Sequence, residues 1–496
     1  MKGELIMDFA TALMNESKKT FTENGATAYN TSGDGLLDFF ASAGSLREAD
    51  TMRKERLFEE AFKVDPLLAT KALFYVRDVR GGLGERQTFR ELIKYLANKH
   101  PEAVIPNIHL IGEFGRYDDL YALTGTPVES IVWDYIKNQL ADDEAKMILG
   151  QPVSLLAKWL KTADASSEKT RQAGIATALC LGMTVREYKR RVKALRKYID
   201  IVERKMSTNE WSEIDYETVP SKAMTNYRTA FLNHDASGFK EYLAKVSKGE
   251  AKINSSTLFP YDILERYNWF GWYGPNSIKE DSVLEAQWKA LPDYVGTEAN
   301  AMVIADTSGS MSGRPINSAV ALAIYFAERN KGAFHNLWMS FSKDSKVQKL
   351  KGDTLAQKLS SIDTTHWDCN TNLERAFMHI LDIAVKNSVP PEEMVKSLII
   401  VSDMEIDSCT GSWLFYDEMK KRFAQRGYEI PNIVFWNVNS RHDIFHADKN
   451  KKGVQLCSGQ AASTFKTLMS SIGMTPTEMM MKVLNSERYT AITIAD

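Results

Sequence analysis

The sequence has few cysteines, and their spacing matches no metal-binding or disulfide motif. Cys180, Cys369, Cys409 and Cys457 lie far apart, and no two of them form a Cys-x-x-Cys pair. This argues against a zinc ribbon and against a disulfide framework, and it favours a reducing compartment. We therefore expect a cytoplasmic protein.

Long apolar runs and an excess of one charge are also missing. No stretch approaches the roughly 20 apolar residues that span a bilayer, and the apolar N-terminal segment carries Glu4 and Asp8, which makes it a poor signal peptide. The formal net charge of −2 shows no overall bias toward nucleic acid, although a near-neutral total can hide local basic faces. With 496 residues, 44% hydrophobic and 25% charged, the chain is expected to fold into two or more globular domains without a membrane segment.

Helical periodicity dominates the first part of the chain. Apolar residues recur at helical spacing in 85–100 and again in 128–140. The clearest helix begins at Thr184, which forms an S/T-x-x-E capping box with Glu187, and its apolar stripe continues in steps of three and four to Val202. Short breaks with glycine or proline separate these helices without a strict repeat, so a degenerate helical solenoid and a compact irregular helical domain both stay open.

The pattern changes near residue 290. Apolar strands at 301–306, 335–342, 397–403 and 432–438 alternate with helices at 316–329, 372–386 and 414–427, and a last helix is expected after Thr475. This alternation predicts βαβ units and a parallel sheet covered on both faces. We predict an α + α/β protein, with an all-helical domain over residues 1–292 and an α/β domain over residues 293–496.

Two of the predicted strands end in an acidic residue. Asp306 ends one and is followed by Thr-Ser-Gly-Ser, Asp403 ends another, and Thr371 precedes a helix between them. Because the carboxyl ends of parallel strands share one edge of a sheet, Asp306, Ser308, Ser310, Thr371 and Asp403 are expected there together. Hard oxygen ligands select magnesium, calcium or manganese, of which we favour magnesium. The alternative is a Ser/Gly turn with acids that cap helices.

This D-x-S-x-S pattern, with a later threonine and a later strand-ending aspartate, resembles the metal-ion-dependent adhesion site of von Willebrand factor A domains. The resemblance implies a Rossmann-like fold in which Ser308, Ser310 and Thr371 bind the cation directly, while Asp306 and Asp403 act largely through water. It also implies that an acidic side chain of a protein partner completes the coordination. The loop before Thr371 reads Asp-Cys-Asn-Thr, where many relatives have glycines.

A helical part followed by such a domain resembles the Ro autoantigen, or TROVE, architecture, and more closely the Ro-like proteins of bacteria and viruses. The segments that carry this closer resemblance are 75–86, 115–123, 202–224 and 252–264. It implies a monomeric ring of HEAT-like helical repeats closed by the A domain. In the Ro family, such a ring binds small structured RNAs on a basic outer face and single-stranded ends of aberrant RNA through its central hole.

Basic residues cluster at two places in the helical part. Segment 186–205 has nine lysines or arginines against three acids, and a Gly-rich break near residue 82 adds further arginines. A solvated charged face is the alternative for the first cluster. For the second, the alternative is a purely structural pairing of its arginines with Asp78, Glu85, Asp118 or Asp119. The candidate RNA contacts are Arg186, Lys189, Arg190, Lys193, Arg196, Lys197, Arg77, Arg80 and Arg86.

The sequence offers no arrangement typical of an enzyme. His442 and His446 lie four residues apart but lack the glutamate of an HExxH motif, so we interpret them as surface histidines. The acidic pairs at 118–119 and 142–143 are interpreted as exposed or helix-capping carboxylates. We predict a non-catalytic RNA-binding scaffold with a divalent-cation site. The alternative is a metal-dependent scaffold for protein–protein interaction without RNA.

Overall fold

Contacts within the chain divide it into two compact units. A computed structural model describes residues 16–271, 274–275, 277–296, 299–341, 345–365, 367, 370–409 and 414–495. The first unit combines residues 1–72 with 258–486, and the second combines 73–257 with 487–496. Residues 73–257 of the second unit are thus inserted between the two parts of the first, and its last segment, 487–496, follows them. The predicted boundary between residues 292 and 293 stays a prediction.

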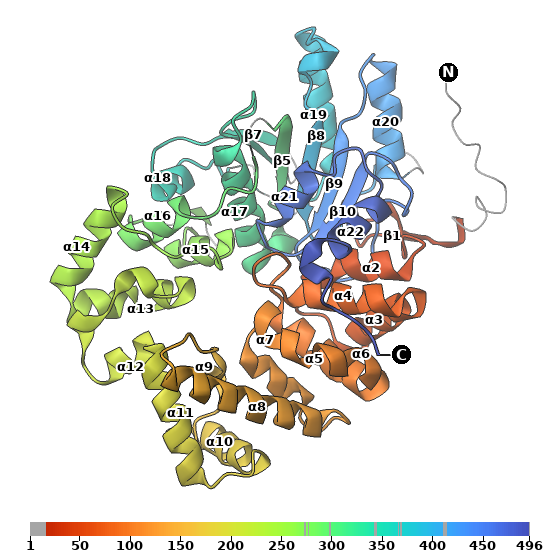
Figure 1. Ribbon diagram of the computed structural model, residues 1–496. Helices are drawn as coiled ribbons and strands as arrows, with labels where there is room; N and C mark the ends of the chain where they lie inside the picture. The colour runs from red at the N-terminus through yellow and green to blue at the C-terminus, as the bar shows by residue number, and fades with distance from the viewer. Residues whose placement is uncertain are drawn as a thin grey trace. The chain divides into compact units, whose positions relative to one another are not determined.

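A six-stranded, mostly parallel sheet forms the centre of the described part of the first unit (Figure 1). Its order is β10-β9-β8-β5-β6-β7, and only β7 is antiparallel to its neighbour. This confirms the predicted α/β character, although β7 and β10 were missed. The strands are β5 (Ala301–Asp306), β6 (Leu337–Phe341), β7 (Lys346–Lys349), β8 (Ser397–Ser402), β9 (Asn432–Asn437) and β10 (Val454–Ser458).

Helices cover both faces of this sheet, which is why every residue of β5 and β8 is buried. One face packs in a core with α19 (Leu373–Lys386) and α20 (Phe415–Gln425), where Phe377 and Phe415 lie 4.9 Å apart between ring centres. On the other face, Trp436 packs against Phe465 of α21 (Thr464–Met469), which also contacts Phe326 of α17 (Arg314–Arg329). Further helices of the unit are α2 (Gly35–Ser42), α3 (Thr51–Val64), α15 (Pro260–Tyr267), α16 (Ser282–Lys289), α18 (Leu355–Ser360) and α22 (Pro476–Leu484).

An N-terminal hairpin also belongs to the core of the first unit. It consists of β1 (Lys19–Phe21) and β2 (Thr27–Tyr29), and its Ala26, Ala28 and Tyr29 are buried in the cluster that contains α19 and α20. Isolated backbone bridges join Gly25 to Asp407 and Tyr29 to Phe445. Residues from the start of the chain therefore complete the core around the carboxyl end of β8.

The second unit is helical throughout its described residues, as the periodicity predicted. In α5, the predicted core residues Phe89, Leu92, Ile93 and Leu96 are fully buried. The unit comprises the end of α4 (Pro66–Arg77), then α5 (Arg86–Lys99), α6 (Pro101–Val104), α7 (Ile111–Phe114), α8 (Glu129–Ile148), α9 (Leu156–Trp159), α10 (Glu168–Cys180), α11 (Val185–Ile199), α12 (Val202–Ser207), α13 (Ser221–His234) and α14 (Ala236–Ser247). Across the described ranges, no helix is long and apolar enough to cross a membrane.

Helix α11 begins at the predicted cap, of which only the Thr184 half of the capping box is formed, and it ends earlier than predicted. The Thr184 hydroxyl accepts a hydrogen bond from the backbone N–H of Glu187, while the Glu187 carboxylate lies 3.8 Å from Arg191. The expectation of one continuous helix to Val202 is wrong, because Asp200 adopts a left-handed backbone conformation with φ of 56° and ends the helix. The chain turns there and α12 follows, which opens a concave surface between the two helices.

Candidate metal site and basic groove

The strands β5 and β8 are neighbours at the centre of the sheet, and their carboxyl ends meet. Parallel pairing matches Ala305 with Val401, so Asp306 and Ser402 end their strands side by side and Asp403 follows. If the strands are ranked by their order in the chain, the sheet reads 3-2-1-4-5-6, and its switch point lies between β5 and β8. This is the position at which open α/β sheets hold their ligands. Asp306 and Asp403 are both buried there.

Asp306 is tied to the backbone and hydroxyl groups around it. Its Oδ1 accepts a hydrogen bond from the Ser308 N–H at 2.9 Å, and its Oδ2 accepts one from Ser402 Oγ at 2.6 Å. The Oγ atoms of Ser308 and Ser310 lie 3.1 Å apart, with Ser308 buried and Ser310 exposed. The structure therefore brings three of the predicted residues into one oxygen-rich cluster at the edge of the sheet.

Thr371 is buried at the same edge, but its hydroxyl faces other groups. Its Oγ1 accepts a hydrogen bond from Asn24 Nδ2 at 2.6 Å and lies 3.0 Å from Asp407 Oδ1. It also lies 3.1 Å from the carbonyl oxygen of Glu405. A direct bond from Thr371 to a cation would require its hydroxyl to leave these partners.

Asp403 has a cationic partner of its own. Its Oδ2 lies 3.0 Å from Arg441 Nη2, and its Oδ1 accepts a hydrogen bond from the Glu405 N–H at 3.2 Å. Burial and the negative charge of Asp403 raise the pKa of Asp306 to about 7. Two like charges in a dry environment oppose each other, so Arg441 relieves only part of the charge at this edge.

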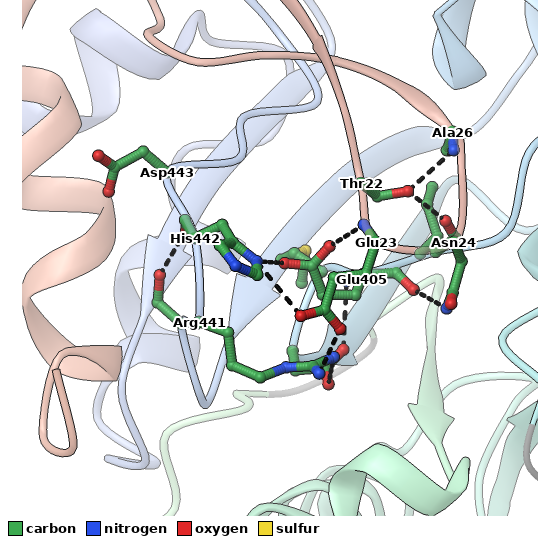
Figure 2. Close-up of polar contacts among 12 residues, drawn as sticks. Thr22, Glu23, Asn24, Ala26, Glu405, Arg441, His442 and Asp443 are labelled. Carbon is green, nitrogen blue, oxygen red and sulfur yellow. Dashed lines mark hydrogen bonds and ion pairs between the residues drawn. The ribbon is translucent and has the colours of Figure 1, made fainter.

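Glu405 anchors a second group of polar contacts, which Figure 2 shows beside the strand end. This carboxylate is buried, with 1% of its side chain exposed. Its Oε2 accepts a hydrogen bond from the Glu23 N–H at 2.7 Å, and its Oε1 lies 2.9 Å from His442 Nδ1. Glu23 in turn forms an ion pair with Arg441. The hairpin loop and the loop after β9 are thereby joined across the candidate site.

The donor set suits a hard divalent cation. Magnesium holds its ligands at 2.0–2.1 Å in octahedral geometry, which separates adjacent ligands by roughly 2.9 Å, close to the distance between the Ser308 and Ser310 hydroxyls. In the described part of the chain, no three histidine, cysteine, aspartate or glutamate side chains gather in a metal-binding group. The candidate site differs from such groups because hydroxyls are its expected direct donors.

A basic groove of about 1110 Å³ lies in the second unit between α9, α11 and α12. Its lining includes the partly exposed ring of Trp159, with the Arg116 guanidinium 3.9 Å from the ring centre. Seven cationic side chains and two acidic ones line it. The cations are Lys158, Lys189, Arg190, Lys193, Arg196, Lys197 and Arg204, and the acids are Asp164 and Glu203.

The predicted basic residues of α11 fall into two groups. Arg196 is held by the structure, because it donates hydrogen bonds to the carbonyl oxygens of Ala157 and Leu160 at 2.8 and 2.7 Å. Lys189 lies 3.0 Å from Asp164. The remaining cations are exposed and have no ion pair among the described residues, namely Arg186, Arg190, Lys193 and Lys197, of which the last three line the groove.

The arginines near the Gly-rich break serve mainly within the second unit. Arg77 is buried, and its Nε lies 2.7 Å from Asp119 Oδ2. Arg80 is exposed and donates to the Glu113 carbonyl oxygen at 2.9 Å, while Arg86 is exposed. Arg77 thus follows the structural alternative of pairing with the acids at 118–119, and its guanidinium is not presented to solvent.

Two family models match this chain. The model described as a domain of unknown function, DUF2828, matches residues 22–123 and 143–299, which together make up more than half of the chain. The chain belongs to the DUF2828 family. A second domain of unknown function, DUF7788, matches residues 300–492, and neither model is a Ro or von Willebrand factor A model. A relative from Acanthamoeba polyphaga mimivirus, "Uncharacterized protein L728", is 28% identical over 94% of this chain and 87% of its own length.

In this DUF2828 chain, the interpretation of the histidine pair was wrong for His446. Its ring is buried, its Nε2 lies 3.0 Å from the Met404 carbonyl oxygen, and burial lowers its pKa to about 4. His442 is exposed, yet it contacts Glu405. The expected exposed or capping role of the acidic pairs is also incomplete, because Asp119 and Asp143 are buried and hydrogen-bonded.

Several residues of the candidate site could not be found from sequence. Glu23, Asn24 and Arg441 contact it from segments that carry no local motif. The hydrogen bond from Glu23 to Glu405 spans 382 positions in the sequence. Only the acidic run that begins at Asp403 gave a signal, since it places carboxylates directly after a buried strand.

Proposed function

We propose that this member of the DUF2828 family is a non-catalytic scaffold that holds a single-stranded stretch of RNA in the basic groove of its second unit. The observation that carries this proposal is the row of exposed cations on one face of α11 that form no ion pair with any residue the structure describes. Arg190, Lys193 and Lys197 follow the spacing i, i+3, i+7 and line the groove together. Over a rise of 1.5 Å per residue they cover about 10 Å of the helix, so they can follow a phosphate backbone.

A smaller apolar pocket beside the groove favours a single strand over a duplex. It has a volume of about 200 Å³ and shares Lys158 and Ile201 with the groove. Leu155, Val202 and Val219 contribute apolar lining. Unpaired bases can turn toward such a surface while their phosphates stay in the basic groove, whereas the bases of a duplex are stacked inside it. The resemblance to Ro-like proteins, which implies binding of aberrant RNA ends, agrees with this choice.

Binding of a labelled single-stranded RNA over a range of salt concentrations tests the proposal. Changing Arg190, Lys193 and Lys197 together to glutamate should abolish measurable binding, and neutralising them should lower the slope of log K against log salt by about 2. A matched control changes Lys169, Lys240 and Lys248, exposed residues of the same unit outside the groove. Equal loss in both triple variants, or no binding by the unaltered chain at low salt, would contradict the proposal.

A divalent-cation site at the carboxyl edge of β5 and β8 is a second candidate function. The 3.1 Å separation of the Ser308 and Ser310 hydroxyls beside the buried carboxylates of Asp306 and Asp403 favours it. The resemblance to von Willebrand factor A domains agrees with this donor set. A bound cation would offer an open coordination position to an acidic side chain of a protein partner. Isothermal titration calorimetry with Mg²⁺ and Mn²⁺ tests the site by measuring cation binding. We expect Asp306→Ala to lose that binding.

A further inference from the structure

Arg441 occupies the position beside Asp403 that a cation at the candidate metal site would take. Its guanidinium contacts the Asp403 carboxylate at 3.0 Å and forms an ion pair with Glu23. Asp403 is fully buried at its side chain, whereas 34% of the Arg441 side chain is exposed. The arginine therefore reaches from the surface to a carboxylate that has no access to bulk water of its own.

The surrounding loop holds Arg441 in this position. Arg53 donates hydrogen bonds to the carbonyl oxygens of Ser440 and Arg441 at 2.9 and 3.0 Å, and it forms an ion pair with Asp443. These contacts fix the loop backbone on α3. The Arg441 side chain is consequently the part that is free to change partners.

The N-terminal hairpin binds the second amino group of the same guanidinium. Glu23 binds it through the carboxylate, while the Glu23 N–H donates to Glu405 at 2.7 Å (Figure 2). The next residue, Asn24, donates to the Thr371 hydroxyl at 2.6 Å and also binds the carbonyl oxygen of Glu405. Arg441 and the hairpin loop thus engage two of the five predicted metal-site residues, Asp403 and Thr371.

We propose that Arg441 is a built-in counter-ion that closes the candidate metal site, and that it and a divalent cation exclude each other from Asp403. A guanidinium and a divalent cation sharing one buried carboxylate would repel each other strongly, because little solvent screens them there. The cation gains Asp403 only when the arginine leaves. Glu23 then loses its partner, and the hairpin loop at residues 22–25 loosens. This inference rests on the cation site proposed above.

Arg441→Gln in the full chain tests the inference by titration with Mn²⁺. The variant keeps a polar side chain of similar length and removes the charge, and we expect Mn²⁺ affinity to rise at least tenfold. Arg426→Gln is the matched control, since Arg426 is an exposed arginine of the same unit whose guanidinium lies 3.8 Å from Asp382. Unchanged or weaker binding in Arg441→Gln, with binding by the unaltered chain, overturns the inference and leaves the cation site standing. If neither the unaltered chain nor Arg441→Gln binds Mn²⁺, both the inference about Arg441 and the proposed cation site are overturned.

Hydrogen exchange in the unaltered chain gives a second measurement that does not depend on a variant. Saturating Mn²⁺ should speed exchange of the amides of Glu23 and its neighbours in the hairpin loop at least severalfold, while the amides of β9 keep their protection. Equal protection of the loop with and without bound Mn²⁺ overturns the coupling of Arg441 to the hairpin.

Discussion

The carboxylate of Asp306 should lower the stability of the metal-free protein at neutral and alkaline pH. Burial and Asp403 raise its pKa from 3.8 to about 7, so the native state keeps a proton that the unfolded state has lost. Stability therefore falls as the pH rises from about 4 to 7. Three pH units correspond to a ceiling of about 4 kcal/mol. Arg441, which faces Asp403 rather than Asp306, leaves most of this cost in place.

Asp306→Asn removes the charge while keeping the shape of the side chain. The amide oxygen can still accept from the Ser308 N–H, and the Ser402 hydroxyl can rotate to accept from the new amide. We expect the metal-free variant to be more stable than the unaltered protein by about 1–3 kcal/mol at pH 8. At pH 5, where the native carboxyl is neutral but the unfolded one is already ionised, only about a third of the gain should remain, and it should vanish below about pH 4.

Native-state hydrogen exchange of peptides from β5 and β8 is the suitable assay. A chain with two compact units need not unfold in one step, so a single melting temperature would mix their contributions. Both proteins are measured in chelator at pH 5 and pH 8, with the intrinsic exchange rate corrected for pH. A less stable variant at pH 8, or the same gain at both pH values, would refute the reasoning. Added Mg²⁺ should then stabilise only the unaltered protein.

Three further predictions concern other parts of the molecule. Leu155→Asp, at the half-exposed edge of the apolar pocket, should weaken single-stranded RNA binding by about tenfold in a filter assay, whereas Leu179→Asp on the exposed surface of α10 should not. Arg196→Ala should cost about 2–3 kcal/mol, seen as faster amide exchange in α9, because it leaves two backbone carbonyls and a hydroxyl unpaired; unchanged exchange would contradict this. The lowered pKa of His446 means that the unfolded state gains a proton first, so stability should fall by about 3 kcal/mol between pH 6.5 and 4. This loss is best seen in Asp306→Asn, which lacks the opposing trend, and a flat profile in that variant would contradict it.

Sequence reasoning succeeded where a pattern is set by local chemistry. The strands that lead into Asp306 and Asp403 are nearly continuous apolar runs, and two-sided burial in a parallel sheet requires such runs. The edge strand β7 reads Lys-Val-Gln-Lys and is only partly buried, so it offered no such signal. The early end of α11 depends on the left-handed backbone of a single residue, Asp200. The spacing of the apolar residues does not predict that conformation.

The parts of the basic groove and of the candidate metal site that were not predicted depend on contacts between residues far apart in the sequence. Whether a charged side chain faces solvent or is bound by the protein is decided by the fold, as Arg196 and Lys197 illustrate on the same helix. The first is bound by backbone carbonyls, and the second is exposed in the groove. Their sequence environments are nearly identical. Likewise, nothing near Arg441 in the sequence indicates that its partners are Asp403 and Glu23.

The hairpin at residues 19–29 is made long before its partners exist. Glu23 and Glu405 are 382 residues apart, which a ribosome adding 5–20 residues per second covers in roughly 20–80 s. During that time the apolar side of the hairpin has no core to join, while residues 73–257 of the second unit emerge. The first unit therefore cannot finish folding until synthesis is nearly complete. A fragment cut at the predicted boundary of residue 293 would contain the sheet but lack the hairpin that covers its strand ends.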